Sequence, residues 1–306
     1  NTSWTDVAFE TSTMQKHNVA FTNGNEQGNY YLSLSYLDND GIVVGNADTY
    51  ERLTGMINAS WKIKPWLEVG TNNQIEHYRS KSVAEGNEYG SLLASVLLMD
   101  PLTPDVYAPN NLPMNMLTAL NNGQPLLKDG KGNYYSVSPF FTGEFGQPLI
   151  MRDNNVAKSG GFNVTGSLYG DFKPVKGLVI TSRLGYRLSG TRTSTVSLPS
   201  YNTSERINPY LGYSAGSSTS IYYQWENFAN YARTFGRHSI NAMIGMSFQK
   251  SSYNYVNGSL TGNEEDALKK NDPIFWYLNY AAASATKGVS GEETESAKLS
   301  YFGRVG

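Results

Sequence analysis

Apolar and polar side chains alternate in several short segments of this chain. Residues 29–37 (NYYLSLSYL) show the pattern most clearly: the even-numbered positions hold tyrosine, leucine, leucine and tyrosine, and tyrosine or serine stands between them. A period of two is typical of a β-strand, whose successive side chains point to opposite faces. An aliphatic centre with an aromatic residue at each end is typical of a strand with lipid on one side and water on the other. The pattern therefore predicts a membrane-spanning strand.

The same alternation returns along the chain. It is clear in residues 52–61, 162–172, 180–189 and 239–249 and weaker in residues 16–22, 66–79 and 221–235. Residues 297–305 have the pattern of a strand that the chain end truncates. Arg183 and Arg187 fall on the polar side of one segment, and arginine inside a strand indicates a water-filled interior. We predict about nine strands in all.

The connections between these strands alternate between short and long. The short ones cover residues 23–29, 62–66, 173–177 and 235–238, and the long ones cover roughly residues 38–50, 80–160, 190–219 and 250–296. An outer-membrane barrel has short periplasmic turns and long extracellular loops, whereas a soluble sandwich has no reason to place every long loop at one end. The predicted fold is all-β, a segment of an antiparallel up-and-down transmembrane β-barrel. The alternative is a soluble β-protein with large insertions.

Composition agrees with this fold class. The longest apolar run, Leu92–Met99, is far shorter than the roughly 20 residues that a membrane-spanning helix needs. We expect only a short helix over Glu88–Met99, ended by Pro101 and Pro104 and packed against its own loop. The 22 Tyr and 30 Gly favour strands and tight turns. A net charge of -2 without a basic stripe argues against binding of nucleic acid, and the lack of Cys excludes disulfides and thiolate metal sites.

The chain carries no motif of a known catalytic or metal site. The three histidines, His17, His77 and His238, are spread along the chain without an HExxH pair, which argues against a zinc-protease site. Neither a Walker A sequence nor a GxGxxG motif is present, so no phosphate-binding loop is expected. Residues 38–41 (DNDG) resemble the start of a calcium loop, but Ile42 stands where an oxygen ligand is required. The sequence therefore predicts no catalytic residue, no metal, no cofactor and no enzyme activity.

Two aromatic clusters lie in the long loops. The first contains Tyr134 and Tyr135 together with three phenylalanines, and the second contains Trp276, Tyr277 and Tyr280 next to Phe275. Aromatic rings can stack on sugars or anchor a protein partner, because they supply a large contact area at low cost in conformational entropy. The alternative is that these rings pack the loops onto one another.

Several short motifs, in a consistent order, resemble the barrel of SusC-like (SusC/RagA) TonB-dependent outer-membrane transporters. The likeness spans essentially the whole chain. The motifs are Asn1–Trp4 with Phe9, Gln15–Asn18, Gly24–Glu26, Asn29–Tyr31, Asp40–Ile42, Tyr50–Arg52, Trp66–Leu67 with Val69–Gly70, Asp100–Tyr107 with Gly132–Tyr134, Asn227–His238 and Ser300–Arg304. Each motif alone is weak, but their order and spacing agree with the barrel prediction made from the alternation of side chains.

The resemblance implies active import of a bulky nutrient, a glycan or a peptide, across the bacterial outer membrane. It further implies a SusD-like surface lipoprotein as partner, energy from the TonB–ExbB–ExbD complex acting through a plug domain, and contact with outer-membrane lipid. The plug, the TonB box and the closing C-terminal strands of such proteins are not visible in this sequence. We therefore expect residues 1–306 to be one part of the barrel domain, about nine of its roughly 22 strands.

Within this interpretation, specific residues are candidates for contact with substrate or partner. We expect Trp276, Tyr277, Tyr280, Tyr134 and Tyr135 to contact substrate or the lipoprotein lid. Arg183, Arg187, Glu68 and Gln74 are expected to line the lumen. Two other functions stay open: a passive porin or adhesin barrel, which would lack a plug, and a soluble glycan-binding or glycan-cleaving β-protein, which would fold without detergent.

Overall fold

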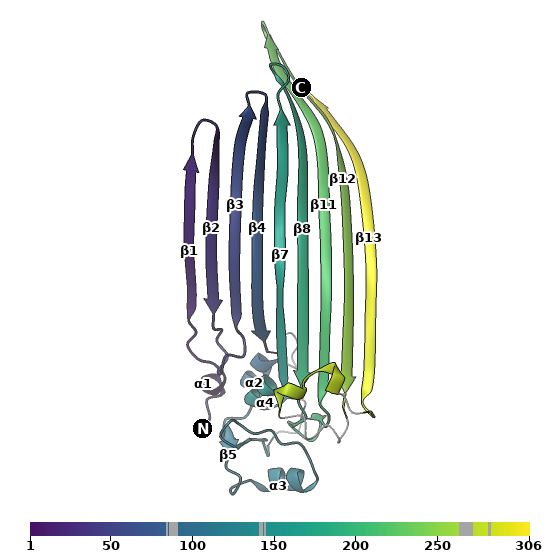
Figure 1. The fold of residues 1–306 in the computed structure, drawn as a ribbon. Helices are drawn as coiled ribbons and strands as arrows, with labels where there is room; N and C mark the ends of the chain where they lie inside the picture. The colour runs from purple at the N-terminus through teal and green to yellow at the C-terminus, as the bar shows by residue number, and fades with distance from the viewer. Residues whose placement is uncertain (84, 86–90, 141–142, 144, 263–271, 281–282) are drawn as a thin grey trace.

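A computed structural model describes all residues except 84, 86–90, 141–142, 144, 263–271 and 281–282. Its main body is one antiparallel sheet of nine strands, in which every strand pairs with its neighbours in chain order (Figure 1). The strands are β1 Met14–Gly24, β2 Gly28–Asn39, β3 Tyr50–Lys64, β4 Leu67–Ser82, β7 Asn155–Phe172, β8 Leu178–Ser197, β11 Gly212–Phe235, β12 His238–Thr261 and β13 Thr286–Val305. The predicted number of strands and the up-and-down order are confirmed.

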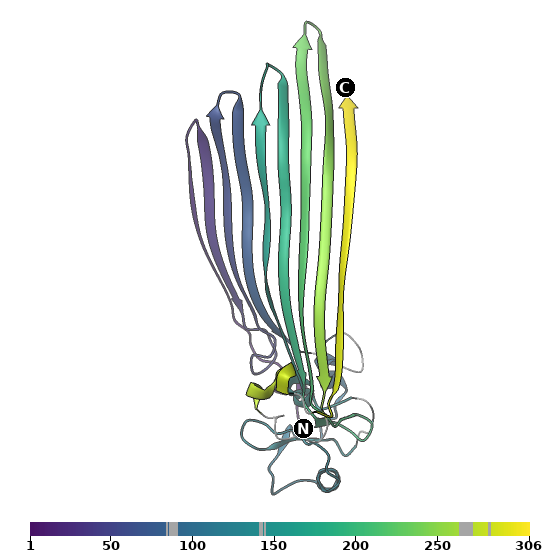
Figure 2. The ribbon, with the colours of Figure 1, turned by 45° about the vertical axis from the view of Figure 1, so that its right-hand side comes forward.

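The hairpin turns gather at one end of the sheet, and the long connections gather at the other (Figures 1 and 2). At the β1–β2 turn, the side chain of Asn25 accepts hydrogen bonds from the backbone N–H groups of Gln27 and Gly28, at 2.9 and 3.0 Å. Gly177 and Gly236 adopt positive φ angles of 91° and 60° in two further turns. Such conformations favour glycine, which has no Cβ to clash with the backbone. The short turns predicted from the sequence are confirmed.

The strands run further towards the loop end than the side-chain alternation indicates. β12 continues to Thr261, and β13 begins at Thr286, although residues 250–296 had been assigned to a loop. β11 likewise begins at Gly212 rather than near residue 221. The prediction was wrong in this respect because these extensions carry polar residues on both faces. Backbone hydrogen bonds hold them together, and those bonds leave no period-two signal.

The two faces of the sheet differ in chemistry, and the register shows which side chains share a face. One row runs through Thr71, Leu168, Leu184, Trp225, Phe248 and Leu299 across β4 to β13. The row beside it contains Asn72, Ser167, Gly185, Gln224, Gln249 and Lys298. Apolar side chains on the first face stay uncovered by protein, as the 57% exposure of Leu34 and the 71% exposure of Ile244 show. A water-exposed patch of this kind is unfavourable, but a lipid-facing one is not.

The apolar face forms a band that crosses the strands obliquely. On β2, the line of apolar side chains ends at Tyr36 on the loop side. The residues paired with Tyr36 across successive strands lead, after six steps from strand to strand, to Asn254 on β12. On β12 the apolar row instead ends at Phe248, six residues nearer the turns. Between β2 and β12 the band edge therefore shifts by about 20 Å over about 29 Å of sheet, an average angle of about 35°. The shift lies between β7 and β12, because Phe162 of β7 still shares the row of Tyr36. Barrel strands tilt by about this angle, so the band lies parallel to a membrane plane.

The height of the band also fits a bilayer. On β7 the apolar row extends from Phe162 to Phe172. Ten residues span about 33 Å along a strand, which at this tilt gives a band about 27 Å tall. Outer-membrane barrels carry apolar bands of about 25 Å.

Small elements close the loop end of the sheet, and most buried side chains lie there. They are the helices α1 Trp4–Ala8, α2 Leu92–Leu98, α3 Met114–Asn121 and α4 Pro148–Asp153, the strand pairs β5 Val106–Tyr107 with β6 Tyr134–Tyr135 and β9 Ser200–Tyr201 with β10 Ile207–Asn208, and the 3-10 turns η2 Pro273–Phe275 and η3 Leu278–Tyr280. Packed clusters join α1 to α2 through Trp4, Ala8, Val96 and Met99, and Leu149 and Ile150 of α4 to Tyr135.

The helix expected over Glu88–Met99 is present as α2. It begins after Ser91, whose side chain accepts a hydrogen bond from the backbone N–H of Ala94 at 3.1 Å. Residues 88–90 lie outside the described part of the chain. Among the described residues, the helices are all too short or too polar to cross a membrane.

Candidate functional site

The polar face of the sheet brings the four predicted lumen residues to one side. Gln74 shares a register row with Thr165 and Arg187, and Arg183 lies opposite Glu226. Glu68 shares its row with Asp171 and Thr181 on the same face, nearer the turns. Because paired residues in an antiparallel sheet point to the same side, this face is opposite to the apolar band. In a barrel whose apolar band faces lipid, this polar face would face the lumen.

A line of hydrogen bonds fixes polar side chains at the middle of this face. The hydroxyl of Tyr222 donates to Oε1 of Gln224 at 2.8 Å. The amide of Gln224 then donates to Glu226 at 2.8 Å and to the hydroxyl of Ser247 at 3.1 Å. Each side chain in the line holds its neighbour in one orientation, so the wall presents an ordered set of donors and acceptors.

Charged groups flank this line. The guanidinium of Arg183 lies 5.9 Å from the ring centre of Phe228, and Arg187 is exposed on the same face. Two strands closer to the N-terminus, Glu76 accepts a hydrogen bond from Asn163 at 2.9 Å and lies 3.7 Å from Arg52. At the turn end, Lys173 donates to Glu68 at 3.0 Å.

The three glutamates of the polar face lie at different positions on the wall. Here Glu68, Glu76 and Glu226 each accept a hydrogen bond from a separate partner on a different part of the wall.

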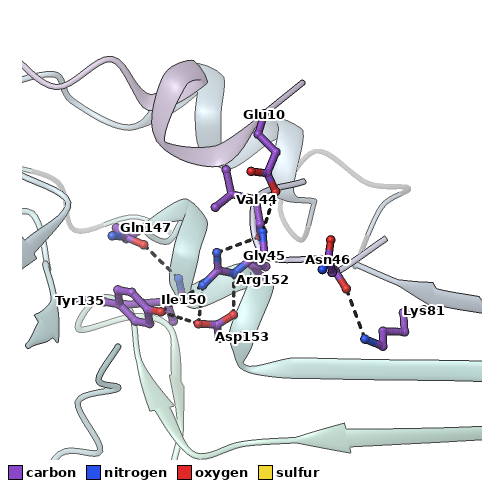
Figure 3. Close-up of polar contacts among 10 residues, drawn as sticks. All are labelled: Glu10, Val44, Gly45, Asn46, Lys81, Tyr135, Gln147, Ile150, Arg152 and Asp153. Atoms are coloured by element: carbon purple, nitrogen blue, oxygen red, sulfur yellow. Dashed lines mark hydrogen bonds and ion pairs between the residues drawn. The ribbon is translucent and has the colours of Figure 1, made fainter. Parts of the chain in front are cut away.

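A partly buried ion pair organises the small elements at the loop end, which together form a cap (Figure 3). Arg152 of α4 donates from Nε and Nη2 to the two carboxylate oxygens of Asp153, at 2.6 and 2.8 Å. Its Nη1 donates to the carbonyl oxygen of Val44 at 3.0 Å, and its Nη2 also donates to the hydroxyl of Tyr135 at 3.1 Å. Tyr135 completes the ring by donating to Asp153 at 2.5 Å. The three side chains thereby connect the β2–β3 loop to the long loop between β4 and β7.

Titration properties follow from this geometry. Burial raises the pKa of the Tyr135 phenol, and the hydrogen bond to the Asp153 carboxylate raises it further. Burial by itself would lower the pKa of Arg152, but the contacts with Asp153 outweigh it and raise that pKa overall. Arg152 therefore keeps its charge, and Tyr135 keeps its proton, across the physiological pH range.

The predicted aromatic contacts are placed in different surroundings. Tyr135 is only 3% exposed and its hydroxyl is already hydrogen-bonded, so in this structure it packs the cap and offers no ring to a ligand. Tyr134 lies beside it with the Lys128 ammonium 4.5 Å from its ring centre.

The second aromatic cluster lies at the loop end of the sheet (Figure 1), over the face that carries Tyr213 and Gly258. The ring of Tyr277 is 6.5 Å from that of Tyr213, and Tyr280 packs against Tyr277 at 6.4 Å. Leu278 occupies the space where Gly258 lacks a side chain, since a Cβ there would come within 2.7 Å of it. Trp276 is half-buried in the same segment, and its indole N–H has no partner among the described residues. A ligand held on the polar face would therefore not reach these rings across the sheet.

Sequence reasoning missed the residues that order the polar face and the cap. Tyr222 and Phe228 stand on the polar side of β11, so aromatic residues occur on both faces there and the alternation is weak. Arg152 and Asp153 are sequence neighbours, and adjacent opposite charges give no signal of a buried pair.

Comparison with known proteins shows which receptors this chain is similar to. The chain is 22% identical over 315 residues to TonB-dependent receptor P3 of Formosa agariphila, covering 100% of this chain and 28% of that protein. It is 25% identical over 321 residues to TonB-dependent receptor SusC of Bacteroides thetaiotaomicron, again covering 100% of this chain and 28% of the relative. The resemblance to SusC-like TonB-dependent receptors is confirmed. No family model matches the chain.

Solved structures of a peptide transporter show the same fold. The structure of the RagAB peptide transporter matches with a TM-score of 0.71 at 18% identity, covering 99% of this chain and 31% of that one. Its 'open-open' state matches with a TM-score of 0.72, covering 30% of that chain. The nine-stranded sheet thus has the fold of a segment of these transporter barrels. The chain spans about 28% of the length of the curated relatives.

Proposed function

We propose that residues 1–306 form part of the wall of a SusC-like transporter that imports a bulky nutrient across the bacterial outer membrane. The observation that carries the proposal is the opposed pair of faces: an apolar band inclined like a barrel wall, and an ordered polar surface behind it. The likeness to TonB-dependent receptors over the whole chain supports it.

The open edges of the sheet support a larger barrel. Among the described residues, β1 and β13 each pair along one edge only. A membrane barrel must pair every edge, because an unpaired backbone group in lipid costs several kcal/mol. We therefore assign residues 1–306 to the barrel domain, with further strands and a plug domain supplied by the rest of the protein.

Import through such a barrel requires work. A pore wide enough for a glycan or a peptide needs a plug to keep the membrane sealed, and the outer membrane has no energy source of its own. The TonB–ExbB–ExbD complex would act on the plug, and a SusD-like lipoprotein would cover the extracellular mouth. We propose that Tyr134 and the rings of Trp276, Tyr277 and Tyr280, all at the loop end, contact that lid.

The polar face suits a substrate rich in hydroxyl or amide groups. The ordered donors and acceptors of Tyr222, Gln224 and Glu226 match those of a sugar or a peptide backbone. Arg183, Arg187 and Gln74 extend the same wall, and Glu68 lies near its turn end. We assign these residues to the lumen lining.

Uptake by whole cells tests this function. Fluorescent oligosaccharides and peptides of graded size would be supplied to cells that express the full-length receptor, with and without an intact tonB gene. We expect receptor-dependent accumulation of at least one probe that stops when TonB is removed. Accumulation at an unchanged rate without TonB would show a passive porin instead.

A further inference from the structure

Four cationic side chains form a patch on the outward face, on the loop side of the apolar band. Arg79 and Arg192 share a register row and flank Gly160. Lys81 and Lys158 are paired directly with each other two residues nearer the loop end. All four side chains are exposed. These rows continue the face that carries Phe162 and Leu188, so the patch lies on the lipid side of the wall and not in the lumen.

The patch lies at the height of the lipid headgroups, just beyond the loop-side edge of the apolar band. Phe162 ends the continuous apolar row of β7 on this face, and Lys158 follows four residues further towards the loop end. That separation is about 13 Å along the strand, or about 10 Å in height at the strand tilt. Headgroup regions extend about 5–8 Å beyond the hydrocarbon, and lysine and arginine side chains can bend back towards that boundary.

The four cations have little internal compensation. Within the described part of the chain, none of them forms an ion pair, and only Lys81 has a hydrogen bond, to the carbonyl oxygen of Asn46 at 3.5 Å. Glu51 lies opposite Arg79, but Lys81 stands opposite Lys158. Like charges directly opposite each other on one face of a sheet are destabilising, so the patch favours an external anion.

A shallow hollow gives that anion room. It has a volume of about 1030 Å³ and is lined by all four cations, with small residues such as Gly160, Ser194 and Ala215 between the strands. Asp38, Asp40 and Glu51 border it on the β2–β3 side, which leaves the β4–β8 side positive. The hollow is open to the outside.

We propose that this patch binds the phosphate groups of outer-leaflet lipids and so fixes the barrel to the lipids around it. The inference rests on the proposed function only in that the sheet is a barrel wall in the outer membrane. Phosphate oxygens accept the charge-assisted hydrogen bonds that arginine and lysine donate, and the apolar band holds the acyl chains of the same molecule. A free anion would gain nothing from the band.

The test compares lipid binding by charge variants of the purified full-length receptor. One variant carries Arg79→Gln, Lys158→Gln and Arg192→Gln. A matched control carries Lys64→Gln, Lys176→Gln and Arg233→Gln, which removes the same charge at the turn end. Lipid A in detergent is the probe, inorganic phosphate is the competitor, and native mass spectrometry measures bound lipid.

We expect the patch variant to bind lipid A at least tenfold more weakly, and the control and wild type to bind alike. Inorganic phosphate at millimolar concentration should not displace the lipid. Equal binding by all three proteins would overturn the proposal, as would equal loss in the control or full displacement by phosphate. Resistance to unfolding in cold SDS confirms that each barrel is folded, and TonB-dependent uptake is scored separately, so failure of lipid binding and failure of import are distinguishable.

Discussion

A charge placed in the middle of the apolar band tests which face of the sheet meets lipid. Leu184 lies halfway along the apolar row of β8, between Ile180 and Leu188. Its outward surroundings are Tyr223, Trp225, Met246, Phe248 and Leu299, without a charged group among them. Leu184→Arg would therefore hold a guanidinium near the bilayer midplane, with no partner within this ring of side chains.

The expected cost follows from depth in the membrane. Arginine at the midplane of a barrel's lipid face destabilises by about 2–4 kcal/mol, and near the interface by about 0–1 kcal/mol. Leu184→Arg should therefore lower the free energy of unfolding by about 3 kcal/mol, whereas Leu188→Arg, four residues nearer the band edge, should cost about 1 kcal/mol or less. Ser167→Arg serves as the control, because Ser167 lies on the polar face in the next register row.

The assay is denaturant unfolding of the full-length receptor in phospholipid vesicles, followed by tryptophan fluorescence. The ranking matters more than the absolute values, because all three substitutions add the same side chain. If Ser167→Arg destabilised the barrel as much as Leu184→Arg, the assignment of the two faces would be wrong. If Leu188→Arg cost as much as Leu184→Arg, the position of the midplane would be wrong.

Three further predictions concern the cap and the lumen wall. Arg152→Ala leaves Asp153 without its two charged hydrogen bonds and should destabilise the cap by about 2–3 kcal/mol, seen as faster cleavage of the long loop in limited proteolysis with the sheet intact. Hydrogen bonds to the carboxylate of Asp100 hold its pKa below the usual 3.8, against the opposing effect of burial. The stability that the ionised carboxylate contributes is therefore present above pH 3.8 and lost as pH falls through the lowered pKa. Amide hydrogen exchange in the chain turn that follows Asp100 should be unchanged from pH 7 to 5 and should accelerate, after correction for the intrinsic rate, only below pH 4. Gln224→Leu breaks the line of hydrogen bonds and should weaken substrate binding about fivefold to tenfold, while Tyr223→Leu on the outward face should not; equal effects in a binding titration would contradict the lumen assignment.

The sequence by itself determined the membrane band and the hairpin turns. Residues 29–37 and 239–249 carry a period-two pattern because one side of each strand faces lipid, and lipid excludes polar groups as strictly as a protein core does. The structure places β2 at Gly28–Asn39 and starts β12 at His238, close to those predictions. Turn positions were equally readable, because glycine and asparagine are selected there by backbone conformation.

Only the tertiary structure decided what lies beyond the band and which residues meet. β12 continues to Thr261 through backbone pairing, which does not depend on side-chain type and therefore leaves no pattern. The contact of Arg152 with Val44 joins segments 108 residues apart, and the register that sets Arg183 opposite Glu226 is fixed by the direct pairing of β8 with β11 across a long connection. The same holds for Tyr277, whose place over the outward face follows from packing on Tyr213. Periodic patterns in the sequence reflect whether a side chain faces lipid or water. Contacts between distant segments depend instead on strand register and on how the loops bring those segments together.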